Sequence, residues 1–220
     1  MTTHIASESP SVVVRGAGRY EVLLVLLVMV LLLAPFESTA LEPVIVALLS
    51  GVLLFALWTS SARTVVVWLG AGLALACIVT AAVAPVWSSS SKGAYAVVSI
   101  ILSLAAIGSI VNHLTQRRAS TLTTLSGAVA IYLLVGLSFA DLYMFLAQLA
   151  GTPFFAQPGP HSAVAYVYFS FTTLTTVGFG DLSAGTDPGR MLAVMEALLG
   201  QLYLVTVVAF IVASHRRERS

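Results

Sequence analysis

Residues 172–181 read TTLTTVGFGD and differ in character from the rest of a strongly apolar chain. The two glycines, Gly178 and Gly180, alternate with Val177 and Phe179. A glycine can adopt a positive φ without steric cost. If the residue between the two glycines keeps a negative φ, successive carbonyl oxygens turn toward the same side of the backbone. The stretch therefore predicts a ladder of backbone oxygens that can replace the water around a dehydrated monovalent cation.

This stretch resembles the selectivity filter of potassium channels, whose carbonyl oxygens replace the hydration shell of the ion. The match covers 176–181, with Phe179 where tyrosine is more usual. The segment before it, 166–175, resembles the pore helix of the same family, with aromatic residues early and threonines late, and the whole helix is expected at about 162–175. The resemblance implies that four copies of the chain close one pore as a homotetramer. It also implies that K⁺ is the transported ion and not a cofactor.

The resemblance further implies roles for individual residues. Asp181 lies at the outer mouth, where it concentrates cations or bonds the pore helix, and Phe179 lacks the hydroxyl group with which tyrosine braces the filter. The implied K⁺ ligands are the carbonyl oxygens of Thr176, Val177, Gly178 and Phe179 with the Thr176 hydroxyl, and Gly180 completes the filter. The implied supports in the pore helix are Tyr168, Phe169, Thr172, Thr173 and Thr175.

Composition places the chain in the membrane. It has 220 residues, of which 59% are hydrophobic and 9% charged, and runs of about 18 or more apolar residues are typical of membrane spans. The formal net charge of +1 gives no reason to expect a nucleic-acid partner. No nucleophile–base pair, phosphate-binding loop or metal-ligand cluster stands out in the sequence. We therefore expect neither enzyme activity nor a cofactor, and we expect the lipid bilayer as the surroundings.

The apolar segments predict an all-α membrane protein with six transmembrane helices, and with a re-entrant pore helix and filter loop between helices five and six. The six spans are expected at about 20–36, 41–58, 64–87, 94–114, 128–150 and 189–213. The domains predicted from them are a cytoplasmic N-terminal tail (1–19), a four-helix region (20–114), a cytoplasmic linker (115–127), the pore domain (128–213) and a basic cytoplasmic tail (214–220).

The distribution of Lys and Arg predicts the orientation in the membrane. With the N-terminus inside, eight arginines are cytoplasmic, and only Lys92 and Arg190 lie outside. Such an excess on one side is typical of cytoplasmic loops. The same orientation places Asp181 on the outer side, as the resemblance requires. We therefore expect a multi-pass plasma-membrane protein with both termini in the cytoplasm.

Six spans with one pore loop are also the plan of voltage-gated channels, but the charges of a voltage sensor are missing. Each gating charge contributes about 2.3 kcal/mol per 100 mV, and the expected fourth span, 94–114, contains no Lys or Arg. Residues 20–114 are therefore expected to form a collar that does not sense voltage. The resemblance covers only 128–213. After residue 213 seven residues remain, so we expect no soluble regulatory domain in this chain.

Three further residues inside the spans attract attention. Asp141 and Glu196 are carboxyl groups within apolar helices, where ionisable residues usually face protein or water. We expect at least one of them to be protonated, or to hydrogen-bond the pore-helix threonines or the filter amides, and so to tune the filter. A helix–helix hydrogen bond without a role in conduction is the alternative. Gly200 is either a gating hinge, by its spacing from the filter, or a site of close helix packing.

Two other functions remain open from the sequence. The same scaffold could form a weakly selective monovalent cation channel, because Phe179 removes one brace of the filter. A transporter or a non-conducting scaffold is the other alternative, and a transporter is expected to show repeated broken helices in its two halves. Only one re-entrant element is predicted here, which favours a channel.

Overall fold

The computed structural model describes residues 18–36, 42–59, 71, 72, 75, 89–116 and 121–217. In this part of the chain all regular elements are helical, apart from one isolated bridge between Phe155 and Ala184. The elements are α1 (Gly18–Leu33), a short 3₁₀ turn η1 (Ala34–Phe36), α2 (Glu42–Thr59), α4 (Ser89–Gln116), α5 (Thr121–Ala150), α6 (Ala163–Leu174) and α7 (Asp187–Arg217).

Three helices of the described part are long and apolar enough to cross a membrane. They are Tyr95–Thr115 of α4, Leu122–Ala150 of α5 and Asp187–Phe210 of α7. The apolar part of α1, Tyr20–Leu33, is shorter. Nearly all of the predicted third span, 64–87, and the predicted tail up to residue 17 lie outside the described residues. The all-helical architecture and these three helices are consistent with the predicted all-α membrane protein.

Two segments predicted to lie outside the spans are partly helical. The linker expected at 115–127 is largely helical, because α4 continues to Gln116 and α5 already begins at Thr121. The tail expected from residue 214 begins inside α7, which ends at Arg217. Polar residues end an apolar stretch, but they do not end a helix, since its hydrogen bonds are made within its own backbone. Apolar length therefore predicts where a helix leaves the membrane, and not where it stops.

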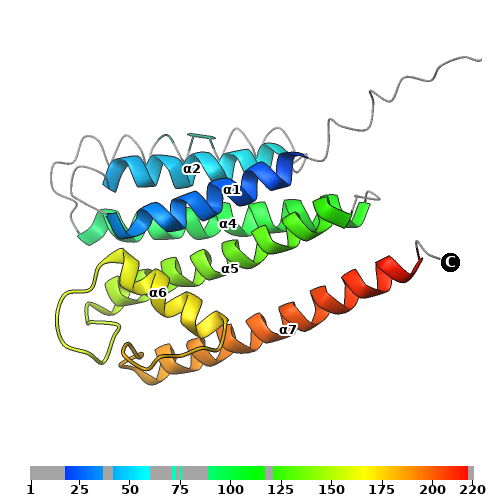
Figure 1. The fold of residues 1–220 in the computed structure, drawn as a ribbon. Coiled ribbons are helices and arrows are strands. Elements are labelled where there is room, and N and C mark those ends of the chain that lie inside the picture. The colour runs from blue at the N-terminus through cyan, green and yellow to red at the C-terminus, as the bar shows by residue number, and fades with distance from the viewer. Residues whose placement is uncertain are drawn as a thin grey trace, which may run out of the picture.

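Helix α5 lies between two groups of helices (Figure 1). Helices α1 and α4 contact one side of α5, and α2 packs on α1 and α4. On the other side α6 slants between α5 and α7, and contacts both. The first group shares an apolar core with α5, and its largest fully buried members include Tyr20, Leu23, Leu27, Ile110 and Leu134.

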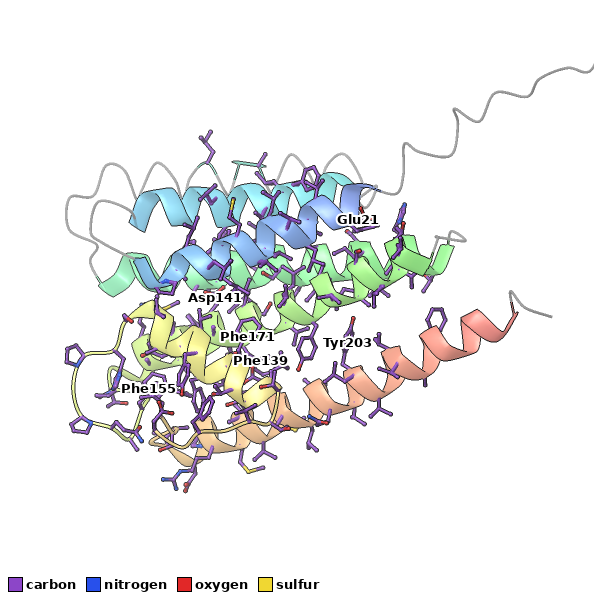
Figure 2. All side chains as sticks on the ribbon, in the orientation of Figure 1. Glu21, Phe139, Asp141, Phe155, Phe171 and Tyr203 are labelled. Carbon is purple, nitrogen blue, oxygen red and sulfur yellow. The ribbon has the colours of Figure 1, made fainter. Side chains whose placement is uncertain are left out.

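An aromatic cluster lies at the loop that connects α5 to α6. Tyr143 and Phe169 come from these two helices, and Phe154 and Phe155 come from the loop; all four rings are buried. Figure 2 shows Phe155 within this loop region. The Phe154 and Phe169 ring centroids lie 5.7 Å apart in an edge-to-face arrangement, which aromatic pairs prefer. The cluster therefore anchors the start of α6 against α5.

Helix α6 approaches α5 closely at Gly136. A Cβ atom at this position would lie 2.8 Å from Cζ of Phe171, so only glycine leaves room for the ring. Phe171 lies on α6 and is labelled in Figure 2. The absence of a side chain at Gly136 thus sets the distance between the two helices.

We predict that Gly136→Ala destabilises the protein by about 1–3 kcal/mol, as overpacking of a core does. The matched control is Gly108→Ala in α4, where a Cβ would meet nothing within 4 Å. That control should be neutral or stabilising by up to about 1 kcal/mol, because a helix glycine becomes an alanine. Thermal unfolding of the purified protein in detergent measures both. Equal midpoints for the two variants would contradict the close contact with Phe171.

Candidate ion-binding site

The backbone beyond α6 alternates between two conformations. Thr176, Gly178 and Gly180 have positive φ angles of 58°, 51° and 81°. Val177 and Phe179 are not among the positive-φ residues of the described chain. The alternation expected at the two glycines is therefore present, and it begins two residues earlier, at Thr176. For a β-branched residue such as threonine a positive φ is a genuine outlier, so local contacts must hold Thr176 there.

The amide groups of this segment point back to the end of α6. The Val177 and Gly178 amides donate to the Thr172 carbonyl at 2.9 and 3.0 Å, and the Thr176 amide donates to the Thr173 carbonyl at 2.9 Å. Within residues 121–217 no backbone amide donates to a carbonyl oxygen of residues 176–180. Backbone acceptors need partners, so these oxygens are available to water or to a cation.

One aromatic residue of α6 braces the segment from the side. The ring of Tyr168 stacks on Phe179, with centroids 6.2 Å apart and planes 6° apart. Its hydroxyl donates to Oδ1 of Asp181 at 3.1 Å. Phe169, which was expected to support the filter in the same way, lies instead in the buried aromatic cluster with Tyr143. Consecutive residues of a helix are turned about 100° apart, so the two rings leave α6 in different directions.

The threonines of α6 act through their carbonyl groups more than through their hydroxyls. The Thr172 hydroxyl donates to the Phe169 carbonyl at 3.0 Å, and the Thr175 hydroxyl donates to the Phe171 carbonyl at 2.6 Å. Both hydroxyls are thus used within their own helix. The carbonyls of Thr172 and Thr173 hold the filter amides.

Glu196 of α7 lies at the centre of a buried hydrogen-bond network behind α6. Its Oε2 accepts from the Tyr143 hydroxyl at 2.6 Å, and its Oε1 lies 2.5 Å from the Ser170 hydroxyl oxygen. Ser170 also contacts the Gly136 carbonyl at 2.7 Å. Glu196 and Ser170 are each 0% exposed. The network joins α5, α6 and α7, and its partner on α6 is a serine and not one of the expected threonines.

Hydrogen counting says which form of Glu196 completes this network. The Ser170 hydroxyl has one hydrogen for two contacts, to the Gly136 carbonyl and to Glu196. The carbonyl can only accept. If Ser170 donates to the carbonyl, the hydrogen between Ser170 and Glu196 must come from the carboxylic acid. The neutral acid therefore satisfies all three contacts, whereas a carboxylate leaves one without a hydrogen.

Asp141 does not join Glu196. It lies in the wall of a cavity of about 300 Å³, which is lined by α1, α2, α4, α5 and the start of α6, with Ser99 and Ser103 of α4 also in the lining. Figure 2 labels it on this side of α5. Within the described residues no hydrogen bond joins Asp141 to the threonines of α6 or to the filter amides. The two acids therefore have different surroundings: Glu196 contacts Tyr143 and Ser170, and Asp141 lines the cavity.

Gly200 of α7 lies directly against the end of α6. A Cβ atom there would overlap the carbonyl oxygen of Leu174, the last residue of α6. The same oxygen accepts a hydrogen bond from the Tyr132 hydroxyl of α5 at 3.2 Å. Three helices thus meet at one carbonyl group. Close packing explains why residue 200 is a glycine. A role of Gly200 as a gating hinge stays a prediction.

Sequence reasoning missed several residues that position this site. Ser170, Tyr143 and Gly136 complete the network around Glu196, and Tyr132 reaches the end of α6. The available signal was a buried acid, which needs hydrogen-bond donors at its own depth. A single chain offers many serines and tyrosines at that depth, so the sequence could not choose among them.

These features together define a helical membrane protein with a candidate cation path. A family model with the description "Ion channel" matches residues 119–215. The match runs from just before α5 to near the end of α7, and it covers less than half of the chain. It supports an ion-channel family for the part that contains residues 176–181, and favours a channel over an enzyme. No curated protein and no solved structure gave a match.

We predict that Gly200→Ala destabilises the protein by about 1–3 kcal/mol, because the new methyl group must displace the Leu174 carbonyl. Gly51→Ala in α2, where a Cβ would meet nothing within 4 Å, is the matched control. Thermal unfolding in detergent distinguishes the two roles of Gly200. Close packing requires a lower midpoint for Gly200→Ala than for the control, whereas a hinge alone would leave the two alike.

For the buried network we predict that Glu196→Gln is close to wild type in stability and that Glu196→Leu is not. A glutamine amide can donate to Ser170 and accept from Tyr143, as the neutral acid does. Leucine removes the hydrogen-bond partner of the Tyr143 and Ser170 hydroxyls. Each buried group left unsatisfied lowers the free energy of unfolding by about 1–3 kcal/mol. Unfolding midpoints of the two variants decide the matter. If glutamine proved as damaging as leucine, the network would depend on a negative charge.

Proposed function

We propose that the protein is the pore-forming subunit of a potassium-selective channel and acts as a homotetramer. The observation that carries this proposal is the backbone of residues 176–180. Its φ angles alternate, its first amides are tied to α6, and no backbone amide of residues 121–217 donates to its carbonyl oxygens. Carbonyl oxygens that accept no backbone hydrogen bond can bind a dehydrated monovalent cation. Rings of such carbonyl oxygens are the ligands in the filters of potassium channels.

Electrostatics at the end of α6 supports a cation at this site. The C-terminus of a helix carries a partial negative charge of about half an elementary charge. Helix α6 ends at Leu174, two residues before the first proposed ligand, Thr176. The Asp181 carboxylate follows the filter and is held by Tyr168, in keeping with its proposed place at the outer mouth. Both features favour positive charge along the same path.

One chain supplies only one strand of oxygens, so the proposal requires four copies around the filter. In the single chain Val177 is 56% exposed and Phe179 is 69% exposed. Much of α7 is likewise exposed and apolar, including Met191, Val194, Leu198, Leu202, Val205 and Val208. Such surface is expected where other copies of the chain or lipid cover it.

The remaining parts fit a channel without its own voltage sensor. The membrane-length part of α4, Tyr95–Thr115, contains no Lys or Arg. Helices α1, α2 and α4 would therefore form a collar around the pore domain. We further propose that the protein lies in the plasma membrane with both termini in the cytoplasm, that Gly200 acts in opening, and that Glu196 tunes the filter through α6.

The proposed function predicts K⁺ flux into liposomes that contain the purified protein, with little competition from Na⁺ and with block by Ba²⁺. Gly178→Ala should abolish selective flux, because alanine at a φ of 51° is strained within the filter. Gly151→Ala is the matched control, since Gly151 has a φ of 63° in the outer loop and room for a Cβ. This control should lose stability but keep its K⁺ selectivity.

The other outcomes are equally informative. Equal Na⁺ and K⁺ flux would point to a weakly selective cation channel, in which the stacking of Phe179 on Tyr168 does not hold the filter narrow. Absence of flux together with absence of K⁺ binding in calorimetry would reject a channel. The tetramer is tested by native mass spectrometry of the detergent-solubilised protein, where a monomer would contradict the proposal.

A further inference from the structure

The side chain of Gln201 reaches from α7 to the inner end of the filter. Its Nε2 lies 2.9 Å from the hydroxyl oxygen of Thr176. Thr176 is the first residue of the alternating segment and the one non-glycine residue of the described chain with a positive φ. Both side chains are exposed in the single chain, on the surface where the proposed pore would lie. The contact therefore joins α7 to the innermost predicted ligand of the ion.

Hydrogen counting fixes the direction of this contact. The Thr176 hydroxyl has one hydrogen, and its oxygen lies 2.7 Å from the Thr175 carbonyl, which can only accept. The hydrogen of the second contact must then come from the amide nitrogen of Gln201. The Thr176 hydroxyl oxygen has two lone pairs. One accepts from Gln201, and the other remains for a cation.

The neighbouring contacts place Gln201 where it can do this. Gly200 lies against the Leu174 carbonyl, so α7 runs unusually close to the end of α6 at this level. Tyr203, two residues beyond Gln201 on α7 and labelled in Figure 2, donates to the Ala128 carbonyl of α5 at 2.6 Å. These two contacts hold α7 on either side of Gln201. The backbone of α7 at Gln201 is therefore held in place, and the side-chain amide of Gln201 contacts Thr176 from there.

We propose that Gln201 is a positioning residue that holds the Thr176 hydroxyl as the innermost ligand of a cation site. The inference rests on the proposed function, because it assumes that residues 176–179 bind the ion. The ligand is a dehydrated monovalent cation, with Ba²⁺ as a divalent probe of similar size. Loss of the amide frees the Thr176 hydroxyl to turn away and removes one support of its positive φ, so the inner site binds cations less tightly.

The test is K⁺ binding to the purified full-length protein in detergent, measured by calorimetry for wild type and Gln201→Leu. Leucine is similar in size but cannot donate. K⁺ affinity should fall roughly three- to tenfold, the effect of one lost hydrogen bond. The matched control is Thr206→Val, because the Thr206 hydroxyl donates only to the Leu202 carbonyl of its own helix, at 2.7 Å. That variant should bind K⁺ as wild type does.

A double-mutant cycle separates positioning from a general loosening of the fold. In a Thr176→Val background the hydroxyl is absent, so Gln201→Leu should have no further effect on K⁺ affinity. Persistence of the full effect in that background, or K⁺ affinity equal to wild type in Gln201→Leu itself, would overturn the inference. Ba²⁺ block in planar bilayers gives a second readout: block from the Gln201 side should weaken, and block from the Asp181 side should not.

The two proposals fail in different ways. Wild-type protein that binds K⁺ without conducting it selectively counts against the proposed function, while the K⁺ affinity of Gln201→Leu still decides the role of Gln201. Selective wild-type flux with unchanged K⁺ affinity in Gln201→Leu counts against the role of Gln201 alone. Wild-type protein that binds no cation rejects both.

Discussion

The Thr172 carbonyl group is the contact on which the rest of the site depends. It accepts the amides of both Val177 and Gly178, and so ties the start of the filter to the last turns of α6. Once these amides point toward the helix, the alternating φ angles leave the carbonyl oxygens without backbone donors. A strand with this backbone has no sheet neighbour to stabilise it. Its geometry is therefore only as well defined as the position of α6.

Helix α6 packs closely against α5 on one side and against α7 on the other, and hydrogen bonds join the three helices between these two contacts. Gly136 of α5 admits the Phe171 ring, and Gly200 of α7 admits the Leu174 carbonyl. Between these contacts the Ser170–Glu196 pair closes a fully buried network. In apolar surroundings an unsatisfied polar group is costly, so a complete network favours one arrangement of the three helices. Packing at the two glycines sets the distances between the helices, and the hydrogen bonds set how the helices are aligned along one another.

The predictions from sequence succeeded where a local property decides the outcome. Apolar length and composition predicted apolar helices, and three of the described ones, in α4, α5 and α7, are long enough to cross a membrane. The helix expected at about 162–175 is present as α6, Ala163–Leu174. The glycine alternation predicted positive φ at Gly178 and Gly180. Most of the predicted linker at 115–127 is helical, because polar residues end an apolar stretch and not a helix. The sequence also did not show that the rotation of α6 places Phe169 in the buried aromatic cluster.

The sequence by itself determined an all-helical protein with apolar helices long enough for a membrane and one backbone segment of alternating φ, because helix length, apolar composition and glycine spacing are properties of consecutive residues. Only the tertiary structure decided which of the two acids in the apolar helices contacts Ser170 of α6. Asp141 lies in the wall of a cavity with Ser99 and Ser103 of α4, whereas Oε1 of Glu196 lies 2.5 Å from the Ser170 hydroxyl oxygen. The tertiary structure also decided that Gln201 meets Thr176. Such contacts join residues 25 or more positions apart, and their formation depends on how the helices pack, which no local pattern encodes.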